Sequence, residues 1–580
     1  MTSDKMRLSL GISMGVFAAV VFYSHQVGGI FPALPVGMVV AVGVLLVSVL
    51  HRPVVNRQTA FVALAGFTLL SMLYKIYLFS YPASLVGFDT GLYAHQTQLL
   101  LDANHVQGLE AAEIGFYARA PLFILLNALI ALLGGTSPEA AMVVYPIIIG
   151  VIYPVSAFIL AQHIAVREPL RTAAISAAVA AVATLSLQYG FHPLAQTLAV
   201  ALWLALLLAL VRYYDRRTRA DFLLVAVFLT SLLLTHKIPG IVVGGTLLTL
   251  LGVTTLTEKR EVSQTLGSSA PILPLLIFTW ITVFVQITFI TGFIRRVVLR
   301  GVVAISPTFF STFVERVFAL FGGSDPAGGA TAPDAVINPL LVFSMNNLYT
   351  ITLFPLAAVG WVALFIHQRT DPYTRVVLAG SGFLMLFVVL GYVRRVVANP
   401  RRFTFFAEVI LIVLAAAVVG WLFVIIGRSF SLAKVPVIFG IVLFLFMAQV
   451  FAMPALPNHP VGPRDYLTET ELQGKRFTQS HVPDRVHTDF FYAAKPPANP
   501  SQVGEPRKYL SMDEELLQRS NNLTRHDYVL YRKNVGVYNT PGKLWRLNWN
   551  AVRLFNRTYS RIYSNDGTTV FIHSVNQSSK

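Results

Sequence analysis

The sequence predicts an α-helical polytopic membrane protein of about 13 transmembrane helices, followed by a small C-terminal extracytoplasmic α/β domain. Of the 580 residues, 55% are hydrophobic and 12% are charged, a composition that soluble globular proteins do not reach. The apolar residues form many continuous runs of about 20, the length that crosses a hydrocarbon core ~30 Å thick. The polar tail after Pro457 instead ends in short Tyr, Val and Ile runs separated by turn signals such as Asn565-Asp566-Gly567.

Apolar stretches bounded by charged residues, Pro or Gly give the predicted spans. They lie near residues 8–24, 30–50, 59–80, 141–164, 172–189, 194–212, 222–236, 238–256, 271–292, 345–366, 375–393, 403–427 and 435–453. The apolar segment at 121–134 is short for a span and is bounded by Pro121 and Gly134. We therefore expect it to be re-entrant or to lie at the membrane interface.

Short loops rich in Lys and Arg are expected on the cytoplasmic side of a cell membrane. All six such loops fall on one side only if the segment at 121–134 does not cross. They contain Arg52 and Arg57, Arg167 and Arg171, Arg212 through Arg219, Lys259 and Arg260, Arg369 and Arg375, and Arg428 and Lys434. The N-terminus is then cytoplasmic and the C-terminal domain extracytoplasmic. The predicted domains are a transmembrane domain at 1–454, with long outer loops at 81–119 and 293–344, and a soluble domain at 455–580.

The composition also narrows the possible partners. The chain has no cysteine, which rules out disulfides and thiolate metal sites. The formal net charge is +17, but the basic residues are spread over many loops rather than gathered in one patch. We therefore expect anionic lipid head groups and phosphates as partners, and no nucleic acid.

The first long outer loop carries the main catalytic candidate, Asp89, which precedes a short amphipathic helix expected to begin near Gly91. Its carboxylate suits either a catalytic role or the capping of that helix, and both can hold for one residue. His95, Asp102 and His105 follow on compatible helical faces, where either a metal site or exposed polar residues are consistent with the spacing. Glu110 and Glu113 are weaker candidates for a second acid.

Basic residues near the outer ends of other spans are candidates for binding an anion. The sequence YVRRVVANPRRF at 392–403 includes Arg395, Arg401 and Arg402, and guanidinium groups suit phosphate oxygens. His236 and Lys237 lie in the break LTHKIPG between two predicted helices. The alternatives are anchoring to head groups for the arginines and a simple turn for Lys237. Arg295, Arg296 and Arg300 open a second loop with the features of a lid, which carries Asp325 and Asp334.

These landmarks resemble the GT-C superfamily of integral membrane glycosyltransferases, which includes oligosaccharyltransferase catalytic subunits, protein O-mannosyltransferases and bacterial aminoarabinose transferases. Phe88-Asp89-Thr90-Gly91-Leu92-Tyr93 is similar to the acidic motif of the family's first outer loop, and Ala120-Pro121-Leu122 to the Pro-Leu start of the next segment. His236-Lys237-Ile238-Pro239-Gly240 resembles a Lys-Gly-Pro break, and Pro400-Arg401-Arg402-Phe403 the Arg-Tyr that opens a late span.

The resemblance implies a GT-C-like topology and an inverting glycosyltransferase that uses a polyprenyl-phosphate (dolichyl-phosphate) sugar donor. It implies Asp89 as the general base. Arg402, Arg401, Arg395, Lys237, His236 and Tyr93 would contact substrate or phosphate. The acceptor would be a lipid-linked glycan, a protein or another cell-surface molecule.

Two departures from the family pattern refine these expectations. Gln188-Tyr189-Gly190-Phe191-His192-Pro193 offers His192 where many relatives have a second acidic motif, so no metal ligand is assigned and a divalent metal ion stays open as a cofactor. The tail lacks a WWDYG-like motif, which favours transfer of a single sugar over transfer of a whole oligosaccharide. The competing functions are a transporter or flippase, or a polymerase or ligase, of lipid-linked saccharides.

Overall fold

The computed structural model describes the residues of two parts, a helical bundle and a C-terminal sheet. The described residues are 2–27, 30–105, 120–165, 167–258, 272–286, 339–366, 371–394, 400–429, 434–452, 464, 466–494, 508–533, 535, 537–540, 543–547 and 549–573. The statements below concern these residues.

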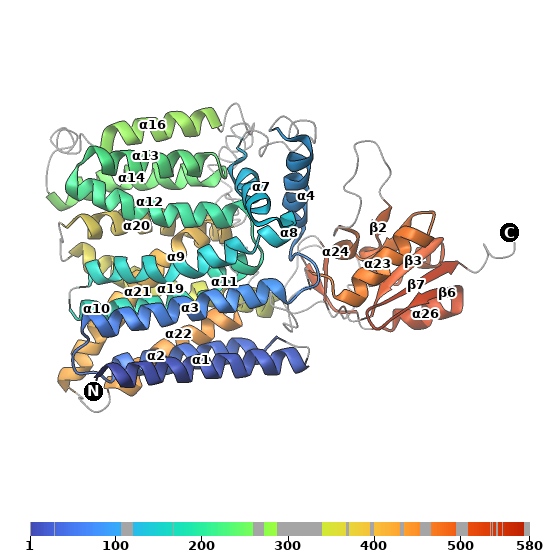
Figure 1. Ribbon diagram of the computed structural model, residues 1–580, viewed down its shortest axis with the longest axis horizontal. Coiled ribbons are helices and arrows are strands. Elements are labelled where there is room, and N and C mark those ends of the chain that lie inside the picture. The colour runs from blue at the N-terminus through green and yellow to red at the C-terminus, as the bar shows by residue number, and fades with distance from the viewer. Residues whose placement is uncertain are drawn as a thin grey trace.

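Long apolar helices lie side by side in the bundle (Figure 1). They are α1 (Thr2–Val27), α2 (Ala33–Leu50), α3 (Arg57–Ser80), α9 (Val144–Ile164), α10 (Pro169–Ala181), α11 (Thr184–Phe191), α12 (Ala195–Arg216), α13 (Arg219–Leu233), α14 (Ile238–Glu258), α16 (Ile272–Val285), α19 (Pro339–Ile366), α20 (Pro372–Arg394), α21 (Pro400–Ser429) and α22 (Lys434–Phe451). Every predicted span overlaps one of these helices. The mostly helical membrane architecture predicted from the sequence is therefore confirmed.

Fewer described helices are long enough to cross a membrane than the 13 spans that the sequence predicts. Nine described helices are long and apolar enough to cross a membrane, or ten if the pair α10 and α11 counts as one broken span. The apolar parts of α16 and α22, at Leu273–Val285 and Val435–Phe451, are shorter. The total of 13 therefore stays a prediction. The expectation of one continuous helix at 172–189 is wrong, because α10 and α11 are bent by 43° at their junction.

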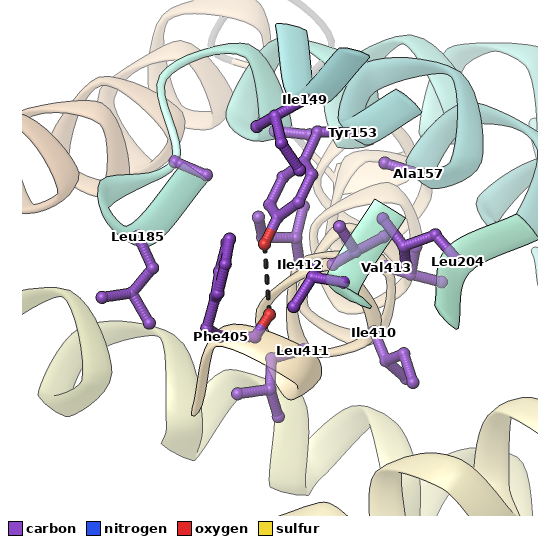
Figure 2. Close-up of a cluster of buried hydrophobic side chains, with 14 of the residues drawn as sticks. Ile149, Tyr153, Ala157, Leu185, Leu204, Phe405, Ile410, Leu411, Ile412 and Val413 are labelled. Carbon is purple, nitrogen blue, oxygen red and sulfur yellow. Dashed lines mark hydrogen bonds between the residues drawn. The ribbon is translucent and has the colours of Figure 1, made fainter. Parts of the chain in front are cut away.

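The core of the bundle lies between α9, α11, α12 and α21 (Figure 2). Tyr153 of α9 is fully buried there, and its hydroxyl donates a hydrogen bond of 3.1 Å to the carbonyl oxygen of Phe405 in α21. The Phe405 ring lies 4.5 Å from the ring of Tyr189, centroid to centroid. Bonds of this kind join neighbouring helices where apolar packing alone gives little specificity in a membrane.

Three shorter helices lie at the end of the bundle that faces the C-terminal sheet, here called the sheet end. They are α4 (Phe88–Ala103), α7 (Leu122–Gly134) and α8 (Pro138–Ala141). In Figure 1, α4 runs steeply across the direction of the long helices. The α4 helix begins at Phe88, three residues before the predicted start at Gly91. The predicted interfacial or re-entrant segment corresponds to α7, an apolar helix of 13 residues.

The C-terminal part contains a five-stranded mixed sheet in the order β2-β1-β3-β7-β6 and a separate hairpin of β4 and β5. Strand β1 is parallel to β2 and β3, whereas β7 is antiparallel to β3 and β6. The strands are β1 (Val486–Thr488), β2 (Tyr509–Ser511), β3 (Tyr528–Arg532), β4 (Tyr538–Thr540), β5 (Lys543–Trp545), β6 (Tyr559–Ser564) and β7 (Thr568–His573). The helical elements are α23 (Glu469–His481), α24 (Phe490–Ala494), α25 (Asp513–Gln518), η2 (Asn521–Thr524) and α26 (Ala551–Thr558). This arrangement agrees with the small α/β domain with a β-rich end that the sequence predicts.

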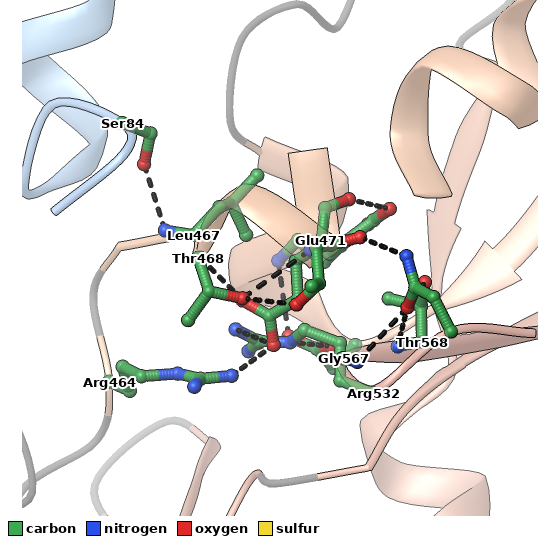
Figure 3. Close-up of polar contacts among 12 residues, drawn as sticks. Ser84, Arg464, Leu467, Thr468, Glu471, Arg532, Gly567 and Thr568 are labelled. Atoms are coloured by element: carbon green, nitrogen blue, oxygen red, sulfur yellow. Dashed lines mark hydrogen bonds and ion pairs between the residues drawn. The ribbon is translucent and has the colours of Figure 1, made fainter. Parts of the chain in front are cut away.

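A buried ionic cluster connects β3, the residue after β1 and α23 of this part (Figure 3). The Arg532 guanidinium donates to both carboxylate oxygens of Asp489, at 2.7 and 2.6 Å. Glu471 pairs with Arg464 and also accepts the Thr468 backbone N–H at 2.9 Å. Because both arginines are met by carboxylates, the buried charges are compensated, as a low-dielectric interior requires.

Leu467, the residue before Thr468 of this cluster, connects the C-terminal part to the bundle. The backbone N–H of Leu467 donates to the Ser84 hydroxyl at 2.8 Å (Figure 3). Ser84 lies between the end of α3 and the start of α4. This bond therefore attaches the C-terminal part to the segment that leads into Asp89.

Asp513 makes the stability of the sheet depend on pH. Burial, and then the neighbouring Asp489, raise the pKa of Asp513 to about 7. The folded chain therefore holds this proton more tightly than the unfolded chain does. The stabilisation is complete below the ordinary pKa near 4 and is lost as the pH rises towards 7.

We predict that Asp513→Asn flattens this dependence, because an amide keeps an acceptor for the Phe490 N–H and carries no proton that titrates. Protease sensitivity of the tail during heating of the full chain in detergent, from pH 5 to 8, measures the effect. Wild type should lose several degrees of midpoint over this range, and the variant should lose less. The exposed Asp566→Asn is the matched control. Equal slopes in all three proteins would contradict the prediction.

Candidate active site at the sheet end of the bundle

The ends of four helices meet at the sheet end. Gln196, in the first turn of α12, donates from Nε2 to the Arg402 carbonyl oxygen in the first turn of α21 at 2.8 Å. Thr197 Oγ1 bonds the Tyr189 carbonyl oxygen at 3.0 Å, which joins α12 to the C-terminal end of α11. His236, just before α14, lies within electrostatic range of Arg402. The N-termini of α12, α14 and α21 therefore come together.

The electrostatic character of this meeting point is positive. Each helix N-terminus carries roughly half a positive charge from its aligned peptide dipoles. The first turns of α12, α14 and α21 contain no acidic residue. Arg401 and Arg402 add two half-buried guanidinium groups, both within electrostatic range of the Tyr189 hydroxyl. Such an arrangement attracts an anion, and planar guanidinium groups suit phosphate oxygens.

His236 supplies a neutral hydrogen-bond donor beside these charges. Its side chain is buried, and Nδ1 accepts the Ile238 backbone N–H at 3.2 Å, which assigns the ring proton to Nε2. Burial, followed by the charges of Arg402 and Lys237, lowers the pKa of His236 to about 3. The imidazole therefore stays neutral at physiological pH. Lys237, the next residue, has an exposed side chain.

Asp89 lies in the first turn of α4 with a half-buried carboxylate. The residue at the cap position is Gly87, whose backbone has φ +79° and no side chain to offer, so Asp89 is not the capping residue. A carboxylate in the first helical turn is still favoured by the helix dipole. A Cβ placed on Gly87 would lie 1.7 Å from His192 Nε2. The turn that precedes Asp89 is therefore packed directly against the end of α11.

Other predicted residues of the first outer loop lie farther along α4. Tyr93 is buried, with its ring centroid 5.1 Å from that of Phe123 in α7. Burial lowers the pKa of His95, an effect that Asp102 opposes. Asp102 accepts a hydrogen bond from Gln98 Nε2 at 2.8 Å, and His105 is exposed beyond the end of the helix.

Within the described part of the chain, no three His, Asp or Glu side chains are placed to hold a metal ion. Several candidates lie outside the described residues. These are Glu110, Glu113, Arg295, Arg296, Arg300, Asp325, Asp334 and Arg395. The structure therefore brings Arg401, Arg402, His236, Lys237 and the Asp89 turn to one end of the bundle, and it packs Tyr93 against α7.

Sequence reasoning missed two residues that shape this end. Gln196 ties α12 to α21, and nothing in its local sequence sets it apart from other polar residues at a helix start. Glu408 lies two turns into α21 and is fully buried. A lone carboxylate within an apolar segment is a signal of function or structure in membrane proteins, and that signal was available.

The contact between Gly87 and His192 leads to a test of the site's architecture. We predict that Gly87→Ala displaces the Asp89 turn, because the added methyl group meets the imidazole and the positive φ disfavours any L side chain. Gly135→Ala is the matched control, because its φ is +58° but its Cβ would have no neighbour within 4 Å. Hydrogen exchange of the peptide 81–105 should accelerate severalfold in Gly87→Ala only.

The double variant Gly87→Ala/His192→Ala separates the two causes. If the clash with His192 dominates, removing the imidazole should return the exchange of 81–105 towards that of wild type. Equal exchange in Gly87→Ala and Gly135→Ala would mean that the packing against His192 does not hold this turn in place.

Comparison with known proteins gives structural likenesses. No protein-family model and no curated protein sequence matches the chain. The Archaeoglobus fulgidus oligosaccharyltransferase in the apo form is 13% identical, with a TM-score of 0.47 over 82% of this chain and 70% of that one. The archaeal oligosaccharyltransferase AglB from the same organism, in complex with an inhibitory peptide and a dolichol-phosphate, is 11% identical, with a TM-score of 0.44 over 81% and 69%.

A bacterial protein gives a further likeness. ArnT from Cupriavidus metallidurans in the apo state is 11% identical, with a TM-score of 0.43 over 89% of this chain and 98% of that one. The chain is thus similar in structure to these solved proteins at 11 to 13% sequence identity.

Proposed function

We propose that the protein is an inverting glycosyltransferase that takes a single sugar from a polyprenyl-phosphate donor. The observation that carries this proposal is the anion-attracting meeting point of three helix N-termini with Arg401 and Arg402, close to a turn that presents a carboxylate. A phosphate leaving group and a general base are the two things that such a reaction needs. Arg401 and Arg402 support the assignment of the phosphate position, and Asp89 supports that of the base.

The phosphate of the donor would bind at the first turn of α21. The Arg402 guanidinium, with Lys237 and the Nε2–H of neutral His236, would donate to its oxygens. Arg395, outside the described residues, is proposed as a further contact. These groups would stabilise the negative charge that grows on the phosphate as the bond to the anomeric carbon breaks. Electrostatic stabilisation of this kind is often the largest contribution of an active site.

Asp89 would act as the general base. As an acceptor hydroxyl attacks the anomeric carbon, its oxygen forms the new glycosidic bond and its proton passes to the Asp89 carboxylate. The bond from the anomeric carbon to the phosphate breaks with both electrons leaving on the phosphate. Because attack and departure occur on opposite faces of the sugar, the configuration inverts.

The membrane placement belongs to the same proposal. The polyprenyl chain would lie in lipid beside the bundle, and the sheet end would face the extracytoplasmic side with the N-terminus in the cytoplasm. The acceptor would be a lipid-linked glycan, a protein or a cell-surface molecule that reaches Asp89 from outside. The domains at 1–454 and 455–580 would supply the transfer site and a cover or acceptor platform.

The first experiment is sugar transfer from a radiolabelled polyprenyl-phosphate donor pool by purified protein in lipid. Asp89→Asn should lower turnover by about 10² to 10⁴-fold, the usual contribution of a general base, while the midpoint of thermal unfolding stays near that of wild type. Asp102→Asn, on the same helix, is the matched control. Equal transfer by wild type and Asp89→Asn would remove Asp89 from catalysis.

Arg402 is tested by a pair of variants. Arg402→Ala should lower turnover by at least about 10²-fold, as the loss of one strong donor to a developing charge does. Arg402→Lys keeps the positive charge but lacks the planar guanidinium group with its paired N–H donors. We therefore expect its turnover to lie between those of Arg402→Ala and wild type. Full activity of Arg402→Lys would show that charge alone matters at this position.

A wild-type protein that transfers no sugar from any donor would favour a transporter or flippase of lipid-linked saccharides. Movement of a labelled lipid-linked saccharide between leaflets of proteoliposomes tests that alternative directly. A polymerase or ligase would instead give products that grow by many units.

A further inference from the structure

The helix break between α10 and α11 creates a problem of unsatisfied backbone groups inside the bundle. At the junction the backbone of Ala183 is extended, and α11 starts afresh at Thr184. The first N–H groups of any helix lack partners within that helix. Ala183, the residue at the cap position, has no side-chain acceptor. Buried N–H groups without a partner are costly in a membrane, so these need acceptors from elsewhere.

Side chains from two other helices meet this need. Glu408 of α21 accepts the Leu185 N–H at Oε1 and the Ser186 N–H at Oε2, at 2.8 and 3.0 Å. Gln449 of α22 accepts the Thr184 N–H at Oε1 at 3.0 Å. The next N–H, that of Leu187, bonds the Ala183 carbonyl oxygen at 2.9 Å. The N-terminus of α11 is therefore fully satisfied, and two of its bonds go to one fully buried carboxylate.

The rest of α11 is held just as closely along its short length. The stem of the fully buried Lys75 lies against Gly190, where an added Cβ would be 2.9 Å from Lys75 Cδ. Lys75 Nζ donates to Ser71 Oγ at 2.6 Å within α3, and its charge lies within electrostatic range of Glu408. Tyr189 stacks on Phe405, three residues before Glu408 in α21.

The two helices joined by Glu408 both lead to the candidate site. In α21, Glu408 follows Arg402 by six residues, which is less than two turns. In α11, the capped N–H groups lie about two turns before His192, which packs against Gly87 beside Asp89. The Glu408 carboxylate thus fixes the distance between the helix that carries the arginines and the helix that supports the Asp89 turn.

We propose that Glu408 is a positioning residue for transfer: by capping the broken helix α11 within the membrane it holds the Asp89 turn in register with Arg402. This inference rests on the proposed function for its catalytic part. Its structural part, the capping of α11, is measurable without activity.

The test combines hydrogen exchange with transfer kinetics. In Glu408→Ala and Gln449→Ala, exchange of the peptide 183–192 should accelerate at least tenfold, because capped N–H groups become free to open. Turnover should fall at least tenfold in Glu408→Ala, while the dissociation constant for polyprenyl phosphate, which Arg402 binds, should change less than threefold. Gln449→Ala removes no charge, so it reports on capping even if Glu408→Ala folds poorly.

The matched control is Asp371→Ala. The Asp371 carboxylate also caps a helix, accepting the Thr374 N–H of α20 at 2.9 Å. It lies away from the sheet end, near Arg375, which bonds Tyr214 in the last turns of α12. Its loss should accelerate exchange in α20 and leave turnover unchanged.

The double variant Lys75→Met/Glu408→Gln separates capping from charge balance. If Glu408 only compensates the Lys75 charge, removing both charges should restore wild-type turnover, and that result would overturn the proposal. We expect instead that the double variant recovers thermal stability but not turnover. Unchanged exchange of 183–192 in Glu408→Ala would also overturn it. A wild type that transfers no sugar, with exchange responding as expected, would contradict the proposed function and leave the capping of α11 established.

Discussion

The bundle depends on a constraint that the bilayer imposes: every backbone polar group within it needs a partner inside the protein. Continuous helices satisfy this by themselves, but the break between α10 and α11 does not. Glu408 and Gln449 supply the missing acceptors from α21 and α22. Because three N–H groups at the start of α11 need acceptors, hydrogen bonds join α11 to α21 and α22. Two of these helices, α11 and α21, have an end at the candidate site, so the hydrogen-bonding demand of the membrane also bears on the geometry there.

The sheet end separates positive and negative groups onto different elements. Arg401, Arg402 and the dipoles of three helices come from the bundle, whereas Asp89 comes from α4, which crosses over its end (Figure 1). A carboxylate on the same turn as the arginines would pair with them and weaken both for catalysis. Neutral His236 fits this arrangement, because its Nδ1 accepts the Ile238 N–H, which leaves an Nε2–H donor that adds no charge to the repulsion among the cations.

The positions of the long helices could be predicted from the sequence because they follow from apolar composition. Helix breaks and helix starts that depend on single contacts were missed. Apolar runs located the long helices of the described residues, since the bilayer demands such runs wherever a helix crosses. The break at Ala183 was missed because no Pro or Gly marks it in the sequence, and the carboxylate that accepts the Leu185 N–H after it lies more than 200 residues away. The start of α4 was placed at Gly91 because Asp89 looks like a cap, whereas Gly87 takes that position through its positive φ. Arg402 and Lys237 were proposed as site residues from their charge. Gln196 acts through a contact that its local sequence does not display, whereas Glu408 was missed although a carboxylate within an apolar segment is a visible signal.

The segment that carries Asp89, at the start of α4, is held by contacts with three other parts of the chain. Before it, the Ser84 hydroxyl accepts the Leu467 N–H of the C-terminal part. At Gly87, the backbone packs against His192 of α11. After it, Tyr93 packs against Phe123 of α7. A base must stay within hydrogen-bond reach of its proton, and misplacement of about 1 Å is costly. The three supports belong to the C-terminal part, α11 and α7, so the position of the Asp89 carboxylate depends on contacts with all three. The C-terminal part thus contacts the start of the segment that carries Asp89 through its backbone, without a side chain of its own.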